Sequence, residues 1–278
     1  MSTGFSDAAL LLIGHGATMN RESAAPVYQH ATALRARHLF AEVREAFWKQ
    51  EPGIQAVLSS ITARRIFAVP LFVSDGYFTE ERIPAELGLC QPGEKEFARV
   101  RREGERTLYY CAPVGTHPSM TGVILARARA VVEKYPFPRA PQPEETALFI
   151  AGHGTSRNEN SRCAIERQAQ LIQSQRIYGD VQAVFIEEQP RIGECYALTR
   201  ARHLVVVPFF ISDGLHACED IPVLLGEPEP IVRRRLEQGQ PAWRNPTEKN
   251  GKLIWYAGSV GTEPGLADVI IERAKEVV

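Results

Sequence analysis

Two histidines and two adjacent glutamates in the second half of the chain are of the residue types that bind divalent metal ions. His153 follows the apolar run TALFIAG, Glu187 and Glu188 follow the run VQAVFI, and His216 comes shortly after HLVVVPFFI. Two imidazoles and one carboxylate would leave positions open on a transition ion such as Co²⁺, Fe²⁺ or Ni²⁺. A single buried histidine is more often a packed core residue, but three converging groups favour a metal site.

The elements that must position these residues form a repeating pattern. Each half of the chain contains four short apolar runs rich in Val, Ile and Phe, separated by stretches with helical spacing. This alternation predicts an α/β fold in which a parallel sheet is covered by helices on both faces. Right-handed crossovers bring the carboxyl ends of the strands to one edge, and a 2-1-3-4 order makes the first three strands neighbours. The loops that carry the two histidines and the glutamates are therefore expected to meet there.

The chain is an internal duplication. A Gly-His-Gly motif occurs at residues 14–16 and again at 152–154, an offset of 138 residues. At the same offset, residues 64–88 and 202–226 are identical at 12 of 25 positions. Unrelated segments of ordinary composition would match at about one or two.

The two copies differ at the expected metal site. His15 takes the place of His153, but Lys49 and Gln50 replace the two glutamates and Phe78 replaces His216. A lysine adds positive charge and a phenylalanine offers no lone pair. We therefore expect only the C-terminal copy to bind the ion.

Length and composition limit the remaining choices. A chain of 278 residues accommodates two domains; we predict them at 1–135 and 146–278, with a linker at 136–145. A net charge of −1 gives no global attraction for nucleic acid or acidic membrane. Five cysteines without a C-x-x-C pair indicate reduced thiols in a cytoplasmic protein, and the run AALLLIG is too short to span a bilayer.

Three segments resemble the CbiX/SirB family of class II chelatases. They are GHGTSRN at 152–158, FIE at 185–187 and, above all, VVVPFFISDGLHACEDIP at 205–222. The resemblance covers nearly the whole chain, once in each half. It implies two tandem flavodoxin-like, chelatase-like domains, each with a four-stranded parallel sheet. The implied activity is ATP-independent insertion of Co²⁺, Fe²⁺ or Ni²⁺ into sirohydrochlorin, in cobalamin or sirohaem biosynthesis.

The resemblance also implies roles for single residues. His153, His216 and Glu187 correspond to the family's catalytic, metal-handling set, and Glu188 is the alternative carboxylate because the loop is one residue shorter than expected. Which histidine accepts a proton and which binds the ion stays open. The metal is a substrate, so no retained cofactor is expected.

Sirohydrochlorin carries several carboxylates, and a nearly neutral protein must meet them with local donors. The residues expected to contact the substrate are Thr155, Ser156, Arg157, Asn158, Ser212 and His15. The first four precede an expected helix, whose N-terminal N–H groups favour anions. Helix capping is the alternative role for Ser156 and Asn158, and a structural turn is the alternative for Ser212.

Two other functions use the same residues. A metal-dependent hydrolase would keep its ion and activate water, and a tetrapyrrole or metal carrier would bind without turnover. The sequence has no G-x-x-x-x-G-K-[ST] motif, which argues against a nucleotide-driven machine. The oligomeric state, monomer or homodimer, is left open.

Overall fold

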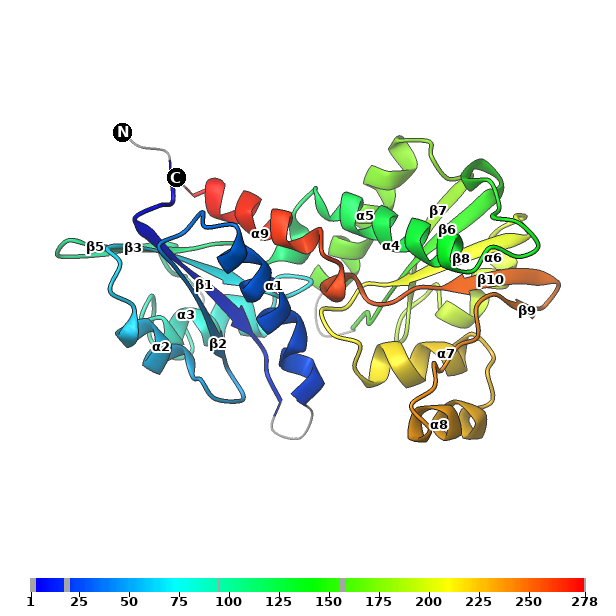
Figure 1. Ribbon diagram of the computed structural model, residues 1–278, viewed down its shortest axis with the longest axis horizontal. Helices are drawn as coiled ribbons and strands as arrows, with labels where there is room; N and C mark the ends of the chain where they lie inside the picture. The colour runs from blue at the N-terminus through cyan, green and yellow to red at the C-terminus, as the bar shows by residue number, and fades with distance from the viewer. Residues whose placement is uncertain (1–3, 18–20, 95, 156–158, 278) are drawn as a thin grey trace. The chain divides into compact units, whose positions relative to one another are not determined.

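The first repeat forms a five-stranded sheet in the computed structural model (Figure 1), which describes residues 4–17, 21–94, 96–155 and 159–277. Its strands are β1 (Ala8–Gly14), β2 (Glu42–Phe47), β3 (Arg65–Pro70), β4 (Val100–Glu103) and β5 (Arg106–Tyr110). Their order is β2-β1-β3-β5-β4, with only β4 antiparallel to its neighbour. All residues of β1 are buried, which explains why this strand is an uninterrupted apolar run.

The second repeat forms the same sheet. Its strands are β6 (Thr146–Gly152), β7 (Asp180–Phe185), β8 (His203–Pro208), β9 (Thr247–Lys249) and β10 (Lys252–Tyr256). Their order is β7-β6-β8-β10-β9, again with one antiparallel edge strand. The predicted duplicated α/β fold is confirmed, while the predicted four strands are joined by a fifth. The additional strands β4 and β9 are short and rich in charged residues, so they lack the apolar pattern that identifies the others.

The chain forms two compact units, residues 1–117 with 264–278 and residues 118–263. The first unit contains α1 (Ala25–Ala36), α2 (Ile54–Ser60), α3 (Ile83–Glu86) and α9 (Leu266–Lys275). The second contains α4 (Met120–Lys134), α5 (Asn160–Ser174), α6 (Cys195–Leu198), α7 (Ile221–Leu224) and α8 (Glu229–Glu237). Short 3₁₀ turns are η1 (Arg21–Ala24), η3 (Val114–Thr116), η4 (Pro143–Glu145), η5 (Ile192–Glu194) and η7 (Val260–Thr262). Two π-helical turns, η2 (Phe78–Arg82) and η6 (His216–Asp220), occupy equivalent places in the repeats.

The last helix of each repeat packs in the other unit. Helix α9 lies beside α1 and against β3, as the red and dark blue helices of Figure 1 show. Helix α4 packs against β8 and β10. The predicted domains 1–135 and 146–278 follow the repeats, so they assign α4 and α9 to the opposite units. Each helix belongs to one repeat in the sequence but packs in the unit formed by the other repeat.

Helices α4 and α9, which we call the exchanged helices, are each held in their unit by hydrogen bonds from one arginine. In the first unit, Arg273 of α9 donates through Nε and Nη2 to the carbonyl oxygen of Pro113, at 3.1 and 2.8 Å. In the second unit, Arg127 of α4 donates through Nε to the carbonyl oxygen of Ser259, at 3.0 Å. Pro113 and Ser259 precede the two VGT turns, so the same contact is made twice.

Candidate functional site

The Gly-His-Gly turn after β6 brings His153 to the carboxyl edge of the second sheet. A Cβ on Gly152 would collide with Cδ1 of Ile165, so there is no room for a side chain here against α5. Gly154 has φ +64°, a left-handed conformation that glycine adopts without strain. A larger residue at position 152 would force the Ile165 side chain to move, and one at position 154 would strain the backbone, so both positions beside the histidine favour glycine.

His153, Glu187 and His216 lie together at this edge. The Nε2 atom of His153 is 3.8 Å from Oε1 of Glu187. The imidazole rings of His153 and His216 are 4.8 Å apart between centroids and meet edge to face. The three side chains are 36%, 53% and 47% exposed, so a ligand can reach them. They come from the loops after β6, β7 and β8, as the strand order requires.

Each of the two imidazoles has one nitrogen held by an oxygen atom. Nδ1 of His153 lies 2.5 Å from the carbonyl oxygen of Gly154, and Nδ1 of His216 lies 2.6 Å from Oδ2 of Asp220. A carbonyl or an ionised carboxylate can only accept a hydrogen bond, so we assign the proton to Nδ1 in both rings. Nε2 is then left with its lone pair, the arrangement usual for a histidine ligand.

Glu188 has a different environment from Glu187. Its carboxylate accepts a hydrogen bond from the backbone N–H of Thr155, and its Oε2 atom lies 3.5 Å from Nη1 of Arg162. In the first repeat Gln50, at the position of Glu188, accepts the same bond from Ala17 at 3.0 Å. This position therefore holds the loop in both repeats, and the geometry favours Glu187 as the carboxylate beside the histidines.

The three groups surround an open space rather than a closed ion cage. Across the part of the chain that the structure describes, no group of three or more His, Cys, Asp or Glu side chains is arranged to hold a metal ion. Because the side chains of His153, Glu187 and His216 are about half exposed, rotation about their side-chain bonds is open to them.

The equivalent edge of the first sheet is aromatic. The His15 ring lies 4.6 Å from the Phe78 ring and 5.7 Å from the Trp48 ring, while Nζ of Lys49 lies 5.3 Å from the centre of the Trp48 ring. Burial lowers the pKa of His15, the carbonyl of Gly16 opposes this, and the charge of Lys49 adds to the lowering. With an aromatic ring in place of the second histidine and a cation in place of the carboxylate, this edge is poorly suited to bind a divalent ion.

The chain was compared with protein-family models, characterised sequences and solved structures. The sequence model of the CbiX family matches residues 9–131 and 147–277, one copy in each repeat. The chain belongs to the CbiX family. A protein of Halobacterium salinarum named probable sirohydrochlorin cobaltochelatase is 41% identical over an alignment of 278 residues that covers 96% of this chain and 91% of that protein. The sirohydrochlorin cobaltochelatase of Methanopyrus kandleri is 30% identical over an alignment of 140 residues that covers 48% of this chain and 96% of that protein.

Solved structures share the fold of this CbiX-family chain. A multi-domain protein of Deinococcus radiodurans, described as structurally similar to chelatases, has a TM-score of 0.78 and 31% identity. The match covers 98% of this chain, which spans 55% of that protein. SirB from Bacillus subtilis has a TM-score of 0.69 with 16% identity, and covers 97% of this chain and 95% of its own. At that identity SirB supports the fold alone.

Sequence reasoning misses one residue beside the site of this CbiX-family chain. Asp220 closes the π turn η6 and holds His216 from four residues further along the chain. The available signal is the spacing His-x-x-x-Asp, which puts two residues on one face only if the segment is helical. Sequence alone predicts a loop after a strand at this point, so it does not reveal the pair.

The predicted substrate contacts are only partly within the described residues. Thr155 is half-buried, and its N–H is bound by Glu188; Ser156, Arg157 and Asn158 lie outside the described residues. The carbonyl oxygen of Ser212 accepts a hydrogen bond from the Ser259 hydroxyl at 3.1 Å. That bond belongs to a structural turn, and substrate contact by the Ser212 hydroxyl stays a prediction.

Proposed function

We propose that this chain inserts a divalent metal ion into sirohydrochlorin without ATP. The observation that carries the proposal is the meeting of His153, Glu187 and His216 at one sheet edge, with Nε2 of each ring unblocked. Family membership and the names of the Halobacterium and Methanopyrus relatives support the reaction. Co²⁺ is the metal that those names favour, and Fe²⁺ and Ni²⁺ suit the same ligands.

The side chains present match the steps of metal insertion. The macrocycle must lose two pyrrole protons, and the ion must exchange water for ring nitrogens. A neutral imidazole can accept a proton near pH 7. We assign this step to His216, because the Asp220 carboxylate beside it compensates the positive charge that the ring acquires. The half-exposed ring passes the first proton to water before it accepts the second. His153 and Glu187 then hold the ion before transfer, and the ion leaves with the product.

The setting of the reaction is also proposed. A tetrapyrrole is the expected partner, in cobalamin or sirohaem biosynthesis. All five cysteines are free, which supports a reducing cytoplasm. None of the helices in the described ranges is both long and apolar enough to cross a membrane.

The test is multiple turnover by the purified chain. Sirohydrochlorin is incubated with Co²⁺, Ni²⁺ or, without oxygen, Fe²⁺, while the absorption spectrum is followed. More than one equivalent of product per chain is expected. A single equivalent would indicate a carrier instead, and an ion that is retained while an ester or phosphoester is cleaved would indicate a hydrolase.

A pair of variants locates the reaction in the second repeat. His216→Ala is expected to slow metal insertion at least about tenfold, since a positioned acid or base contributes about 10²–10⁴. His15→Ala, the matched change in the first repeat, is expected to have a much smaller effect. Circular dichroism checks that both variants fold. Loss in His15→Ala alone would place the reaction in the first repeat.

A further inference from the structure

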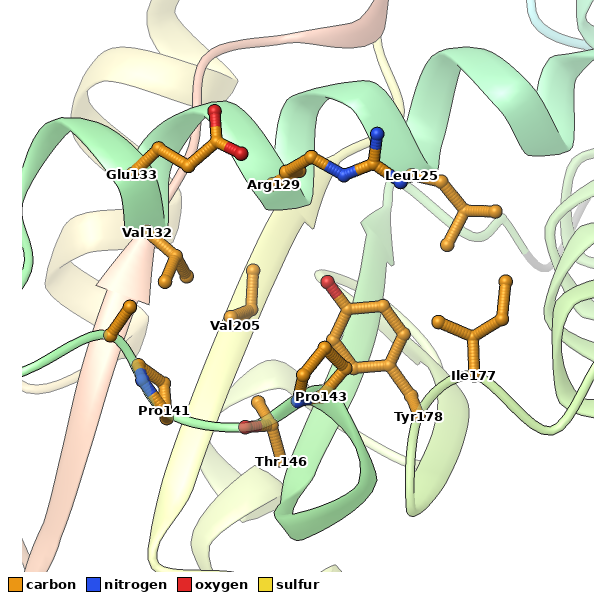
Figure 2. Close-up of a pocket in the computed structure, with 11 residues that line it drawn as sticks. Leu125, Arg129, Val132, Glu133, Pro141, Pro143, Thr146, Ile177, Tyr178 and Val205 are labelled. Atoms are coloured by element: carbon orange, nitrogen blue, oxygen red, sulfur yellow. The ribbon is translucent and has the colours of Figure 1, made fainter.

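The second unit contains a cavity on the side of the sheet covered by α4, away from the metal edge. Its volume is about 250 Å³, and its apolar walls include Leu125 and Val132 of α4, Ile177 and Val205 (Figure 2). Thr146, the first residue of β6, also lines it, whereas His153 follows the last residue of that strand. The cavity therefore lies toward the amino ends of the strands and is distinct from the site described above.

Two polar side chains face this apolar space. Figure 2 shows the Tyr178 ring with its hydroxyl directed toward α4, from which the Arg129 side chain extends. Tyr178 is only 8% exposed. Among the described residues, its hydroxyl has no hydrogen-bond partner, and the Arg129 guanidinium forms neither a hydrogen bond nor an ion pair. Glu133, one helical turn after Arg129, also lines the cavity without pairing with it.

Both groups act as donors at neutral pH. Burial raises the pKa of Tyr178 to about 12, although the nearby charge of Arg129 lowers it. The hydroxyl therefore keeps its proton, and the guanidinium is always charged. Arg129 is exposed while Tyr178 is buried, so a carboxylate that enters the cavity from solvent can meet both donors.

The first repeat shows how the same space is filled when no ligand is needed. Phe5, Phe40 and Phe67 stand where the second repeat has Pro143, Tyr178 and Val205, by the 138-residue offset. The Phe5 ring lies 4.7 Å from that of Phe40 and 5.0 Å from that of Phe67. The scaffold can thus close this space with packed aromatic rings. In the second repeat smaller side chains and a tyrosine hydroxyl leave it open.

We propose that this cavity is a second ligand site that binds a small apolar monocarboxylate. The carboxylate accepts hydrogen bonds from the Arg129 guanidinium and the Tyr178 hydroxyl, and the hydrocarbon part lies against Ile177 and Val205. A guanidinium paired with a carboxylate makes the strong, charge-assisted kind of hydrogen bond. The volume lies below the range of about 300–1,000 Å³ typical of drug-sized ligands, which selects a compact acid. The proposal is independent of metal insertion.

The test uses the full chain and three probe acids, phenylacetate, benzoate and 3-methylbutanoate. Isothermal titration calorimetry and ligand-observed NMR measure binding, with phenylacetamide as the uncharged comparison. At least one of the three acids is expected to bind. If phenylacetate binds, phenylacetamide is expected to bind at least about tenfold more weakly. Arg129→Gln should weaken acid binding at least about tenfold, because a hydrogen bond to a charged group is lost. Tyr178→Phe, which removes only the hydroxyl, should weaken it several-fold.

Val205→Phe copies the first repeat and is the decisive variant. The Phe ring is expected to fill the cavity, abolish acid binding and leave the melting temperature unchanged or higher. Lys275→Gln is the matched control, because Lys275 of α9 has in the first unit the place that Arg129 of α4 has in the second; it should leave binding unchanged. His216→Ala should also retain binding, which separates this site from the metal edge.

Three results would overturn the proposal. The first is that none of the three acids binds. The second is that a folded Val205→Phe chain binds them as the unchanged protein does. If Val205→Phe does not fold, the third result decides: Arg129→Gln and Tyr178→Phe both bind the acid with the dissociation constant of the unchanged protein.

Discussion

At the residue scale, the duplication separates side chains that shape a loop from those free to react. Position 188 and its counterpart 50 both accept a backbone hydrogen bond from the loop after the first strand of their sheet. Position 187 and its counterpart 49 carry opposite charges, Glu187 in one repeat and Lys49 in the other. We infer that the side chain at position 188 shapes the loop, as Gln50 does, and that the side chain at position 187 is the one free to take part in the reaction.

This difference predicts the outcome of replacing each glutamate by glutamine. Glu187→Gln removes the negative charge beside His153 and is expected to lower the rate of metal insertion at least about tenfold. Glu188→Gln is expected to keep most of the activity, because Gln50 makes the same hydrogen bond in the first repeat. Steady-state rates with Co²⁺ and sirohydrochlorin check both. The reverse ranking would transfer the metal-binding role to Glu188.

Asp220 provides a prediction about positioning. Removing a partner that orients a metal-site histidine typically costs about 10–100-fold in affinity or activity. Asp220→Asn is expected to lower kcat within that range while KM for sirohydrochlorin stays nearly constant, since His216 keeps its place but loses its carboxylate. Asp220→Glu should recover part of kcat. An unchanged kcat in Asp220→Asn would show that the contact is structural only.

The sequence is sufficient to place His153, Glu187 and His216 at one sheet edge, because strand order and handedness decide where loops meet. It is not sufficient to choose between Glu187 and Glu188, since adjacent residues in a loop point in directions that only the local backbone fixes. Asp220 is missed for a related reason. Its contact with His216 depends on a π-helical turn, which the spacing of apolar residues in the sequence does not predict.

At the element scale, the repeats match the sequence prediction but the exchange of α4 and α9 does not appear in it. Both helices carry an arginine at equivalent positions, Arg127 and Arg273, and each could satisfy the carbonyl of either repeat. Local sequence therefore does not say which sheet a helix covers. The choice is made by chain connections and packing, which become visible only in three dimensions.

The arginine contacts predict a stability change in each unit. Arg273 is only 6% exposed, and Arg273→Met would remove its two hydrogen bonds to the carbonyl oxygen of Pro113, which keeps those from the N–H and hydroxyl of Thr116. A hydrogen bond from a charged group contributes about 1.5–3 kcal/mol, and a loss of about that size is expected in the free energy of unfolding. Arg127→Met, the matched change, should cost less, because Arg127 is 19% exposed. Urea denaturation followed by circular dichroism measures both. Equal stability of the unchanged chain and the Arg273 variant would contradict the role of this contact.

At the scale of the whole molecule, neither repeat contains all of its own covering helices. The first sheet is covered by α9, whose buried residues include Leu266, Val269 and Ile270. A relative from Methanopyrus matches over 140 residues that make up 96% of its length, so a single repeat can exist as a complete chain. Such a chain must supply the missing helix in another way, and its own last helix is the available one.

This reasoning predicts the behaviour of a fragment of the present chain. Residues 1–139 contain β1 to β5 and α4 but lack α9, so as a monomer the fragment would expose the apolar face that α9 covers. We expect it to fold only as a dimer, in which α4 of each copy takes the place of α9 and Arg127 binds the carbonyl of Pro113. Size-exclusion chromatography with light scattering measures the mass, and circular dichroism measures folding across a dilution series.

A second shortened chain separates the missing helix from other effects of truncation. Residues 1–117 joined to 264–278 by a flexible linker restore the first unit with α9 and omit α4. This chain is expected to be a folded monomer at concentrations where the 1–139 fragment dissociates and unfolds, because it carries the helix that its sheet needs. A stable monomer of residues 1–139 would show instead that the first sheet does not depend on the exchanged helix.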